Sequence, residues 1–157
     1  MPASVKIEYR GHIPKMPRRD QNTVMRESYE DLGKHFFEHN LPRRFTVQGG
    51  RTLGYSRRSP KHNAIKKRLF GHQLPFVFSG ETRQRALSNL TRIVAKAKKG
   101  LGKVELRVNA PALNFHPKYR AEFERIAQQE VGPLERKLET TATKKFDDYK
   151  NTESFSG

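Results

Sequence analysis

Residues 91–109, TRIVAKAKKGLGKVELRVN, hold the pattern that decides the fold. Apolar residues occupy every second position from Ile93 to Ala97 and again from Val104 to Val108. A period of two places such side chains on one face of a β-strand. The turn-like sequence KKGLG at 98–102 lies between the two runs and favours a hairpin. The stretch therefore predicts two antiparallel strands.

One further strand and a helix are expected before the hairpin. Val5–Tyr9 alternates in the same way and predicts a short first strand. After the breaker between Pro14 and Pro17, Asp20 is suited to cap a helix that ends at Pro42. The apolar residues at helical spacing within it are Val24, Met25, Tyr29, Leu32, Phe36 and Phe37.

A long helical pattern runs from Pro117 to Tyr149. Pro133 lies inside it, and the proline ring would clash with the carbonyl group four residues earlier. The helix is therefore expected either to kink at Pro133 or to end at Gly132 and restart. Residues 151–157 are predicted to form a flexible tail.

These patterns predict one α+β domain over residues 1–150. Its small antiparallel sheet has three to four strands, and the N-terminal helix and the long C-terminal helix pack on one face of the sheet. The run Leu74–Gly80 predicts a strand or extended segment, and Glu81–Leu90 contains a short helix. Residues 43–71 are glycine-rich at their start and predict a long, exposed basic loop or arm, with a short helix from Ser59-Pro60 to Gly71.

The positive charge of the chain is concentrated in its middle. Of the 157 residues, 32 are Lys or Arg and 16 are Asp or Glu, which gives a formal net charge of +16. Residues 43–103 contain 16 basic side chains and one acidic side chain, Glu81, whereas both flanks are close to neutral. Such a surplus opposes compaction and favours a negatively charged partner, either nucleic acid or an acidic protein surface.

Composition disfavours several function classes. The sequence has no cysteine, so disulfides, cysteine zinc sites and thiol nucleophiles are excluded. It has no apolar run of the roughly 18 residues that would cross a bilayer, and no secretory h-region follows its N-terminus. We therefore expect neither membrane insertion nor secretion. No catalytic motif is recognisable, so we predict no enzymatic activity and no cofactor.

One short motif invites a metal-site interpretation. His35–His39 has the H-x-x-E-H spacing of zinc peptidases, in which two histidines one helical turn apart bind the metal. Such a site needs a third protein ligand, and the sequence marks none. A polar helix face beside Phe36 and Phe37 is the favoured interpretation, and no metal site is predicted.

The segment from His35 to Leu87 resembles a known family as a whole. KHFFEHNLPRRFT at 34–46 and GYSRRSPKHNAIKKRLFGHQLPFVFSGETRQRAL at 54–87 resemble neck and tail-completion proteins of long-tailed bacteriophages. The C-terminal YRAEFERIAQQEVGPLERKLE at 119–139 also looks like the closing helix of such proteins. The matching motif positions are Gly54, Tyr55, Arg58, Ser59, Lys66, Lys67, Gly71, His72, Pro75, Phe76, Val77, Ser79, Gly80 and Arg83.

This resemblance implies a structural virion protein without an active site. It would form a homo-oligomeric ring of six or twelve copies, bind portal-side and tail-side rings, and surround the channel through which DNA passes. The virion neck would be its location, after assembly in the host cytoplasm. The alternative that the charge leaves open is a basic nucleic-acid-binding module.

Two groups of residues are the candidate site. The docking residues, expected mainly at ring contacts, are Arg43, Arg44, Arg51, Tyr55, Arg57, Arg58, Lys61, Lys66, Lys67 and Arg68. The residues expected to form a turn and core motif are Gly71, Pro75, Phe76, Ser79, Gly80 and Arg83.

Overall fold

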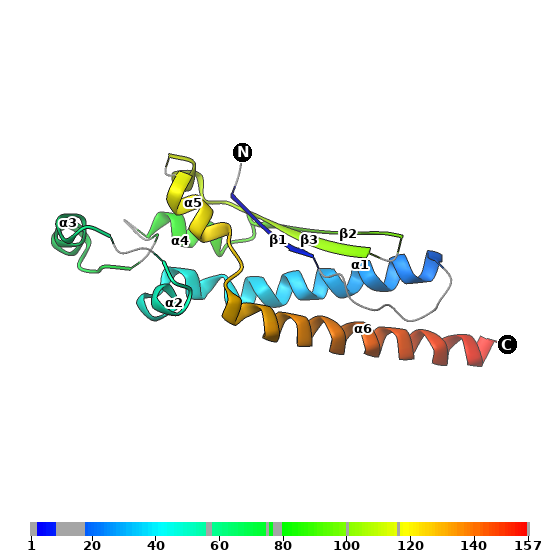
Figure 1. Ribbon diagram of the computed structural model, residues 1–157. Coiled ribbons are helices and arrows are strands. Elements are labelled where there is room, and N and C mark those ends of the chain that lie inside the picture. Colours follow the sequence, from blue (N-terminus) through cyan, green and yellow to red (C-terminus); the bar gives the residue numbers. More distant parts are fainter. Residues whose placement is uncertain are drawn as a thin grey trace.

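The computed structural model describes residues 3–8, 18–55, 58–74, 76, 80–99, 101–115 and 117–156. They form three layers (Figure 1): an antiparallel sheet, then helix α1 (Arg18–His35) packed on the sheet, then helix α6 (Gln128–Ser156) packed on α1. The shorter helices gather at one end of the molecule. The predicted α+β class is confirmed.

The sheet contains the predicted hairpin and the predicted first strand. Strands β1 (Ala3–Glu8), β2 (Arg92–Lys98) and β3 (Leu101–Val108) are antiparallel in the order β1-β3-β2. Pairing of β2 with β3 extends to Lys98 opposite Leu101, so the connecting loop holds two residues rather than the five that the sequence suggests. Lys99 has a φ of +54°, as such tight hairpin loops require.

Helix α1 lies unusually close to the sheet at two glycines. A Cβ atom on Gly33 would come within 2.6 Å of Ile93 and 2.7 Å of Val104. A Cβ atom on Gly102 of β3 would come within 2.3 Å of the Tyr29 ring. The predicted helix is confirmed as α1. It begins two residues before Asp20, so Asp20 lies in its first turn and does not cap it.

The end of α1 differs from the expected stop at Pro42. A π-helical turn, η1 (Phe36–Asn40), follows α1 directly, and a 3-10 turn, η2 (Pro42–Phe45), follows the π turn. The Leu41 N–H donates to the Phe36 carbonyl at 2.8 Å, the long-range bond that defines a π turn. Pro42 thus starts the next turn instead of simply ending the helix.

The C-terminal helical region breaks at a different place from the one predicted. Helix α5 (Pro117–Glu124) ends before Arg125, and α6 runs through Pro133 without interruption and on to Ser156. The predicted end at Gly132 with a restart at Pro133 is therefore wrong, and residues 151–156, which were predicted as a flexible tail, belong to α6. The break falls instead at residues 125–127. Around it, the Phe123 and Arg125 carbonyls accept hydrogen bonds from the Arg44 side chain, and the Ala127 N–H donates to Glu130.

The segment 43–71 is mostly helical, which corrects the expectation of an exposed loop. After η2 it forms α2 (Val47–Thr52) and α3 (Pro60–Phe70). The Thr46 hydroxyl caps α2 by accepting from the Gly49 N–H at 2.9 Å. Gly49 is buried, and a Cβ atom there would lie 1.8 Å from the Arg43 carbonyl oxygen. This glycine is therefore required for close packing and not for loop flexibility.

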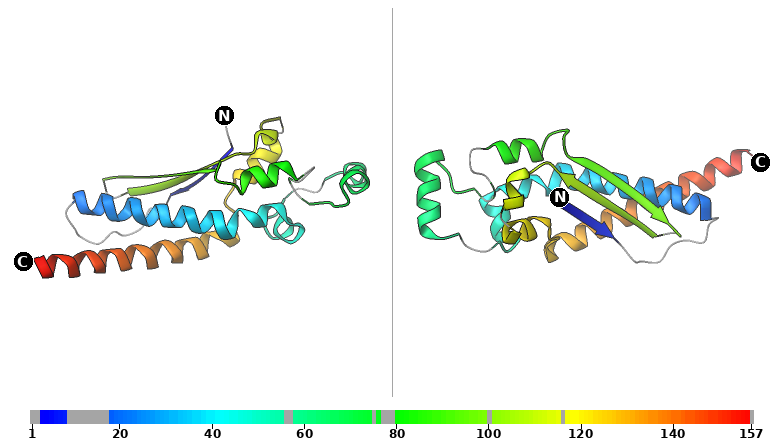
Figure 2. Two further views of the ribbon diagram at one scale, coloured as in Figure 1. Left: turned by 180° about the vertical axis from the view of Figure 1, so that it is seen from behind. Right: turned by 90° about the horizontal axis from the view of Figure 1, so that it is seen from above.

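The predicted basic helix is confirmed as α3, which Ser59 caps and Gly71 ends with a φ of +73°. Figures 1 and 2 show α3 at one end, apart from the layered body. Within Leu74–Gly80, Leu74 and Phe76 do not belong to a strand, and residues 75 and 77–79 lie outside the described residues. The helix expected within Glu81–Leu90 is α4 (Glu81–Ala86), and a 3-10 turn, η3 (Pro111–Phe115), follows β3.

Candidate functional site

The predicted docking residues do not form one surface. Five of them, Arg43, Arg51, Lys61, Lys67 and Arg68, are exposed. Arg44 and Lys66 are buried, and Tyr55 and Arg58 are half-buried. Arg57 lies outside the described residues.

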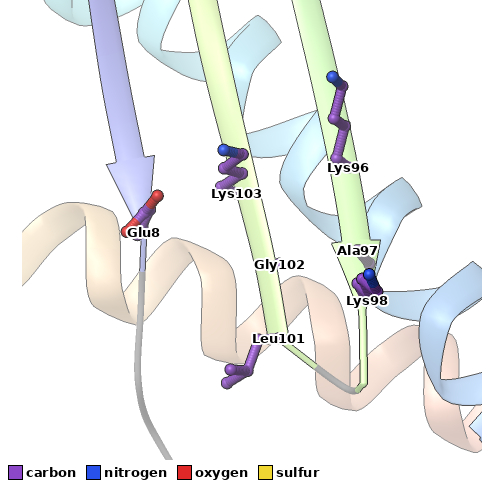
Figure 3. A pocket seen from close by; sticks show the side chains of 7 residues that line it. All are labelled: Glu8, Lys96, Ala97, Lys98, Leu101, Gly102 and Lys103. Atoms are coloured by element: carbon purple, nitrogen blue, oxygen red, sulfur yellow. The ribbon is translucent and has the colours of Figure 1, made fainter.

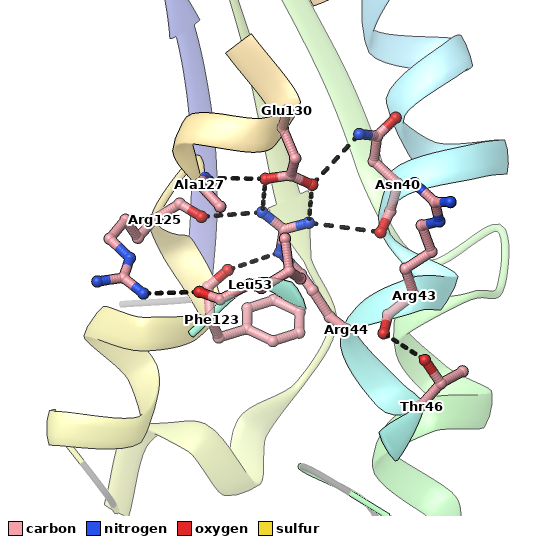
Figure 4. Close-up of polar contacts among 9 residues, drawn as sticks. All are labelled: Asn40, Arg43, Arg44, Thr46, Leu53, Phe123, Arg125, Ala127 and Glu130. Carbon is pink, nitrogen blue, oxygen red and sulfur yellow. Dashed lines mark hydrogen bonds and ion pairs between the residues drawn. The ribbon is translucent and has the colours of Figure 1, made fainter. Parts of the chain in front are cut away.

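Arg44 is completely buried, and all five of its N–H donors are used within the chain (Figure 4). Nη1 and Nη2 donate to the two carboxylate oxygens of Glu130 at 2.7 and 2.9 Å. Nε donates to the Phe123 carbonyl at 3.0 Å, Nη2 also to the Arg125 carbonyl at 2.9 Å, and Nη1 also to the Asn40 carbonyl at 3.4 Å. A docking role for Arg44 is therefore wrong.

Glu130 completes this cluster from the first turn of α6. Its carboxylate accepts from the Asn40 side chain at 3.2 Å and from the Ala127 backbone N–H at 3.0 Å. Because Ala127 directly precedes α6, the second bond is one half of a capping box. Burial disfavours ionisation of Glu130, but the hydrogen bonds and charge of Arg44 outweigh it and hold the pKa of Glu130 below its ordinary value.

The two unusual turns after α1 separate neighbouring arginines. Arg43 is exposed, whereas Arg44 enters the core, where its guanidinium carbon lies 4.8 Å from the centroid of the Phe36 ring. Because Glu130 lies 86 residues further along the chain, the sequence offers no local sign that Arg44 has a buried partner.

Arg58 is also engaged inside the chain, which corrects its assignment to docking. Its Nη1 donates to Glu122 at 3.2 Å, and only 13% and 14% of the two side chains are exposed. Its guanidinium carbon lies 3.6 Å from the centroid of the Tyr119 ring and 5.6 Å from that of Phe76. These contacts tie the segment before α3 to α5.

Lys66 is the buried residue of α3, and its Nζ donates to the carbonyl of Leu74. Burial and the nearby charge of Arg58 lower the pKa of Lys66 to about 8. The side chain therefore anchors α3 to the segment that follows it, and its assignment to a docking surface is wrong.

Tyr55 and Phe76 belong to an aromatic cluster. Their ring centroids lie 4.8 Å apart, and the Phe76 ring lies 5.3 Å from Phe123 and 6.5 Å from Phe45. Burial raises the pKa of the Tyr55 hydroxyl, which has no hydrogen-bond partner among the described residues. Tyr55 thus packs inwards instead of presenting its ring to a partner. Phe76 has a φ of +55°, a strained conformation for a bulky residue.

Of the other predicted motif residues, the two glycines lie at helix ends. Gly71 ends α3, and Gly80 precedes α4 with a φ of +94°. Arg83 is exposed on α4. Pro75 and Ser79 lie outside the described residues.

The exposed side chains of α3 combine positive charge with apolar surface. Leu69 is 57% exposed, and Ile65 and Phe70 are 36% and 37% exposed. Lys61, Lys67 and Arg68 are exposed on the same helix. An isolated exposed apolar residue is ordinary, but three on one outlying helix indicate a surface that a partner can cover.

Sequence reasoning missed a second basic surface, the sheet face turned away from α1. We call it the open face; its residues are Ser4, Lys6, Glu8, Arg92, Val94, Lys96, Lys98, Leu101, Lys103, Glu105 and Arg107. Six of these side chains are basic and two are acidic. No described helix lies over its central and turn-side part (Figure 2). The sequence could have revealed this surface, because basic residues alternate with the apolar ones in the predicted hairpin.

The charges of the open face are distributed unevenly across the sheet. In the β1–β3 pair, Lys6 is opposite Glu105 and Glu8 is opposite Lys103. In the β2–β3 pair, Lys96 is opposite Lys103 and Arg92 is opposite Arg107. Like charges directly opposite one another destabilise a sheet. Although Lys103 is also opposite Glu8 and Arg107 lies 3.7 Å from Glu105, the cations of this side outnumber these two carboxylates.

A hollow lies at the hairpin end of the sheet (Figure 3). Its volume is about 360 Å³, and Lys96, Lys98 and Lys103 contribute to its lining together with Glu8 and Leu101. The hollow is therefore more basic than acidic, and the lysine side chains stand on the viewer's side of the strands, away from α1.

The histidine motif has only part of what a zinc site requires. The His35 and His39 rings are 4.6 Å apart between centroids, and burial followed by the charge of His39 lowers the pKa of His35. Among the described residues, no three His, Cys, Asp or Glu side chains are grouped so that they could hold a metal ion. The third ligand that the zinc peptidase hypothesis needs is thus missing from the described part of the chain.

Comparisons with protein-family models, with curated protein sequences and with solved structures return no match to this chain. Within the described residues, no helix is both long and apolar enough to span a bilayer.

Proposed function

We propose that the protein is a structural, non-enzymatic subunit of the neck of a long-tailed phage virion. Six or twelve copies would close a ring between the portal side and the tail side, as the resemblance of residues 35–87 implies. The observation that carries this proposal is helix α3, an outlying helix with an exposed apolar surface.

Helix α3 has the features of a contact element. A helix on a globular body normally buries its apolar stripe, but the buried side chain of α3 is Lys66 while Ile65 and Leu69 are exposed. These two residues are four positions apart and therefore lie on one side of the helix. Complete burial of one such side chain contributes roughly 1.5–3 kcal/mol, so covering this side of α3 is favourable.

The distribution of charge favours another copy of the chain as the partner. Residues 43–85 contain 11 basic side chains and one acidic side chain, whereas α1 and α6 together carry ten acidic and nine basic side chains. The basic end of one copy would repel the same end of another copy, but it can contact the nearly neutral long helices of the next. A contact between two different surfaces is heterologous, and such contacts close into a ring when the rotation between copies permits.

A matched pair of substitutions tests the proposal. Leu69 of α3 and Leu90, which follows α4, are both 57% exposed. We expect Leu69→Asp to abolish ring formation without unfolding the chain, and Leu90→Asp to leave it intact. Native mass spectrometry and negative-stain electron microscopy measure the copy number, and far-UV circular dichroism checks the fold.

The wild-type protein is examined alone and after mixing with portal or tail-tube rings, because some subunits assemble only on a neighbouring ring. A chain that stays monomeric in both conditions would contradict the proposal. Equal assembly of Leu69→Asp and wild type would remove α3 from the contact.

A further inference from the structure

We propose that the open face binds the phosphate backbone of duplex DNA without reading its sequence. The inference goes beyond ring assembly and uses different residues, because the open face lies on the body of the protein and α3 lies at its end (Figure 1).

The excess charge on this face is intrinsic to the strands. Its six basic residues, Lys6, Arg92, Lys96, Lys98, Lys103 and Arg107, face two acidic residues, Glu8 and Glu105. Glu105 Oε1 lies 3.7 Å from Arg107 Nε and Glu105 is also opposite Lys6, while Glu8 is opposite Lys103. Lys96 and Lys98 therefore have no acidic residue opposite them in the sheet.

The like-charge pairs are costly unless an anion lies over them. Arg92 with Arg107 and Lys96 with Lys103 are each directly opposite across β2 and β3. The Cβ atoms of directly opposite residues in a sheet are only about 4.5–5.5 Å apart, so the like charges of each pair weaken the sheet, and Glu8 and Glu105 offset part of this effect. A bound polyanion would turn this repulsion into attraction, since each of its charges can lie between two cations.

The close spacing of these cations favours a uniformly charged polymer over an acidic protein. Alternate residues of a strand are roughly 6.6–6.8 Å apart and neighbouring strands about 4.8 Å apart, so the cations form a closely spaced lattice on the twisted sheet. DNA presents one negative charge per about 1.7 Å of its axis, which supplies phosphates to any such lattice. Carboxylates on a protein surface are scattered, and the protein would need to match the lattice residue by residue.

The lack of aromatic side chains on the open face disfavours binding by base stacking. Its two apolar members are Val94 and Leu101, and none of its members is aromatic. Single-strand binders typically stack bases on aromatic side chains, which this face cannot provide. Contact is therefore expected with the backbone of a duplex, with equal affinity for unrelated sequences.

Fluorescence anisotropy with labelled 30-base-pair duplexes of two unrelated sequences tests the inference at 50–200 mM salt. The Leu69→Asp chain is used, so that the measurement counts the contacts of one subunit. If six cations contact phosphates, log K falls against log salt with a slope of about −5, roughly a thousandfold loss of affinity over this range.

Three double variants locate the contact. Lys96→Gln/Lys103→Gln is expected to reduce the slope to about −3.5, so that the loss becomes roughly a hundredfold. Lys137→Gln/Lys144→Gln removes the same charge from α6, and Lys67→Gln/Arg68→Gln removes it from α3. Both should keep the slope of the parent chain.

A slope near zero, or a slope unaffected by Lys96→Gln/Lys103→Gln, would overturn the inference. An equal reduction in the α6 variant would show a net-charge effect, and a reduction confined to the α3 variant would move the site to α3; either result also overturns it. Displacement of DNA by poly-glutamate at the same charge concentration would identify an acidic protein as the better partner. If Leu69→Asp still assembles, the ring contact was wrongly placed, and the slope comparison between variants still tests the open face.

Discussion

The cluster around Arg44 and the open face of the sheet are built from the same kinds of residue, yet they have opposite relations to the fold. Arg44 is completely buried, and each of its N–H groups has an acceptor within the chain. On the open face, Lys96 and Lys103 lie opposite each other in solvent. A buried charge destabilises the folded chain unless it is paired within it, whereas an exposed charge remains solvated and can bind a separate molecule.

Removing the acidic half of the buried cluster should have the largest effect on stability. Glu130→Ala leaves the Arg44 guanidinium buried without its carboxylate, and we expect the free energy of unfolding to fall by about 3–5 kcal/mol. Urea titration followed by circular dichroism measures the change. The control is Glu81→Ala, which removes the exposed pair with Arg85 and should cost less than about 1 kcal/mol. Equal costs for both variants would contradict the distinction.

Acid should weaken the same cluster by a smaller amount, because a protonated carboxyl can still form hydrogen bonds. The folded protein lowers the pKa of Glu130, so the unfolded chain takes up the proton first as pH falls. The stabilisation is complete above the unfolded pKa of roughly 4.3 and is lost as pH falls through the folded value. Thermal unfolding of wild type and Glu130→Gln between pH 7 and pH 2.5 measures it; parallel curves would refute it.

Arg58 lies between the two extremes, since its ion pair with Glu122 is mostly but not completely covered. Arg58→Ala should reduce the free energy of unfolding by about 1–3 kcal/mol, between the values of surface and buried pairs. Arg51→Ala, at an exposed position, should have almost no effect in the same denaturant titration. A neutral Arg58→Ala would return this residue to the docking surface.

The smallest effects on the free energy of unfolding should come from substitutions on the open face. They should have opposite signs in the β2–β3 pair and in the β1–β3 pair. Lys96→Glu creates an opposite-charge pair with Lys103 and should stabilise the free protein by about 0.2–1 kcal/mol. Lys6→Glu places a like charge opposite Glu105 and should destabilise it by a similar amount. Thermal midpoints at low salt give the comparison. The same sign for both variants would show that net charge, and not cross-strand pairing, controls stability.

Regular elements were predictable because their patterns are local. The alternation in Ile93–Ala97 and Val104–Val108 defined the hairpin, and the helical spacing from Val24 to Phe36 defined α1. The break before α6 was misplaced because the proline rule considers one helix alone. Arg44 contacts that break from outside the segment, through bonds to Phe123, Arg125 and Glu130 that span 79–86 residues.

The candidate site was less predictable for the same reason. The charge pattern shows that residues 43–103 are basic, but it does not distinguish one cation from another. Charge alone therefore predicts docking roles for Arg44, Arg58 and Lys66. Their burial depends on partners such as Glu122 and the Leu74 carbonyl, which only the folded chain brings near. The basic positions of the open face were visible as the polar half of the hairpin, but their cross-strand partners depend on the register.

The sequence by itself determined the strands, the two long helices, the absence of cysteine chemistry and the excess of positive charge, because these follow from the spacing and type of residues along the chain. Only the tertiary structure decided which positive charges are consumed inside the protein and which face outwards. Burial and pairing depend on distances between residues far apart in sequence, and those distances exist only once the chain has folded.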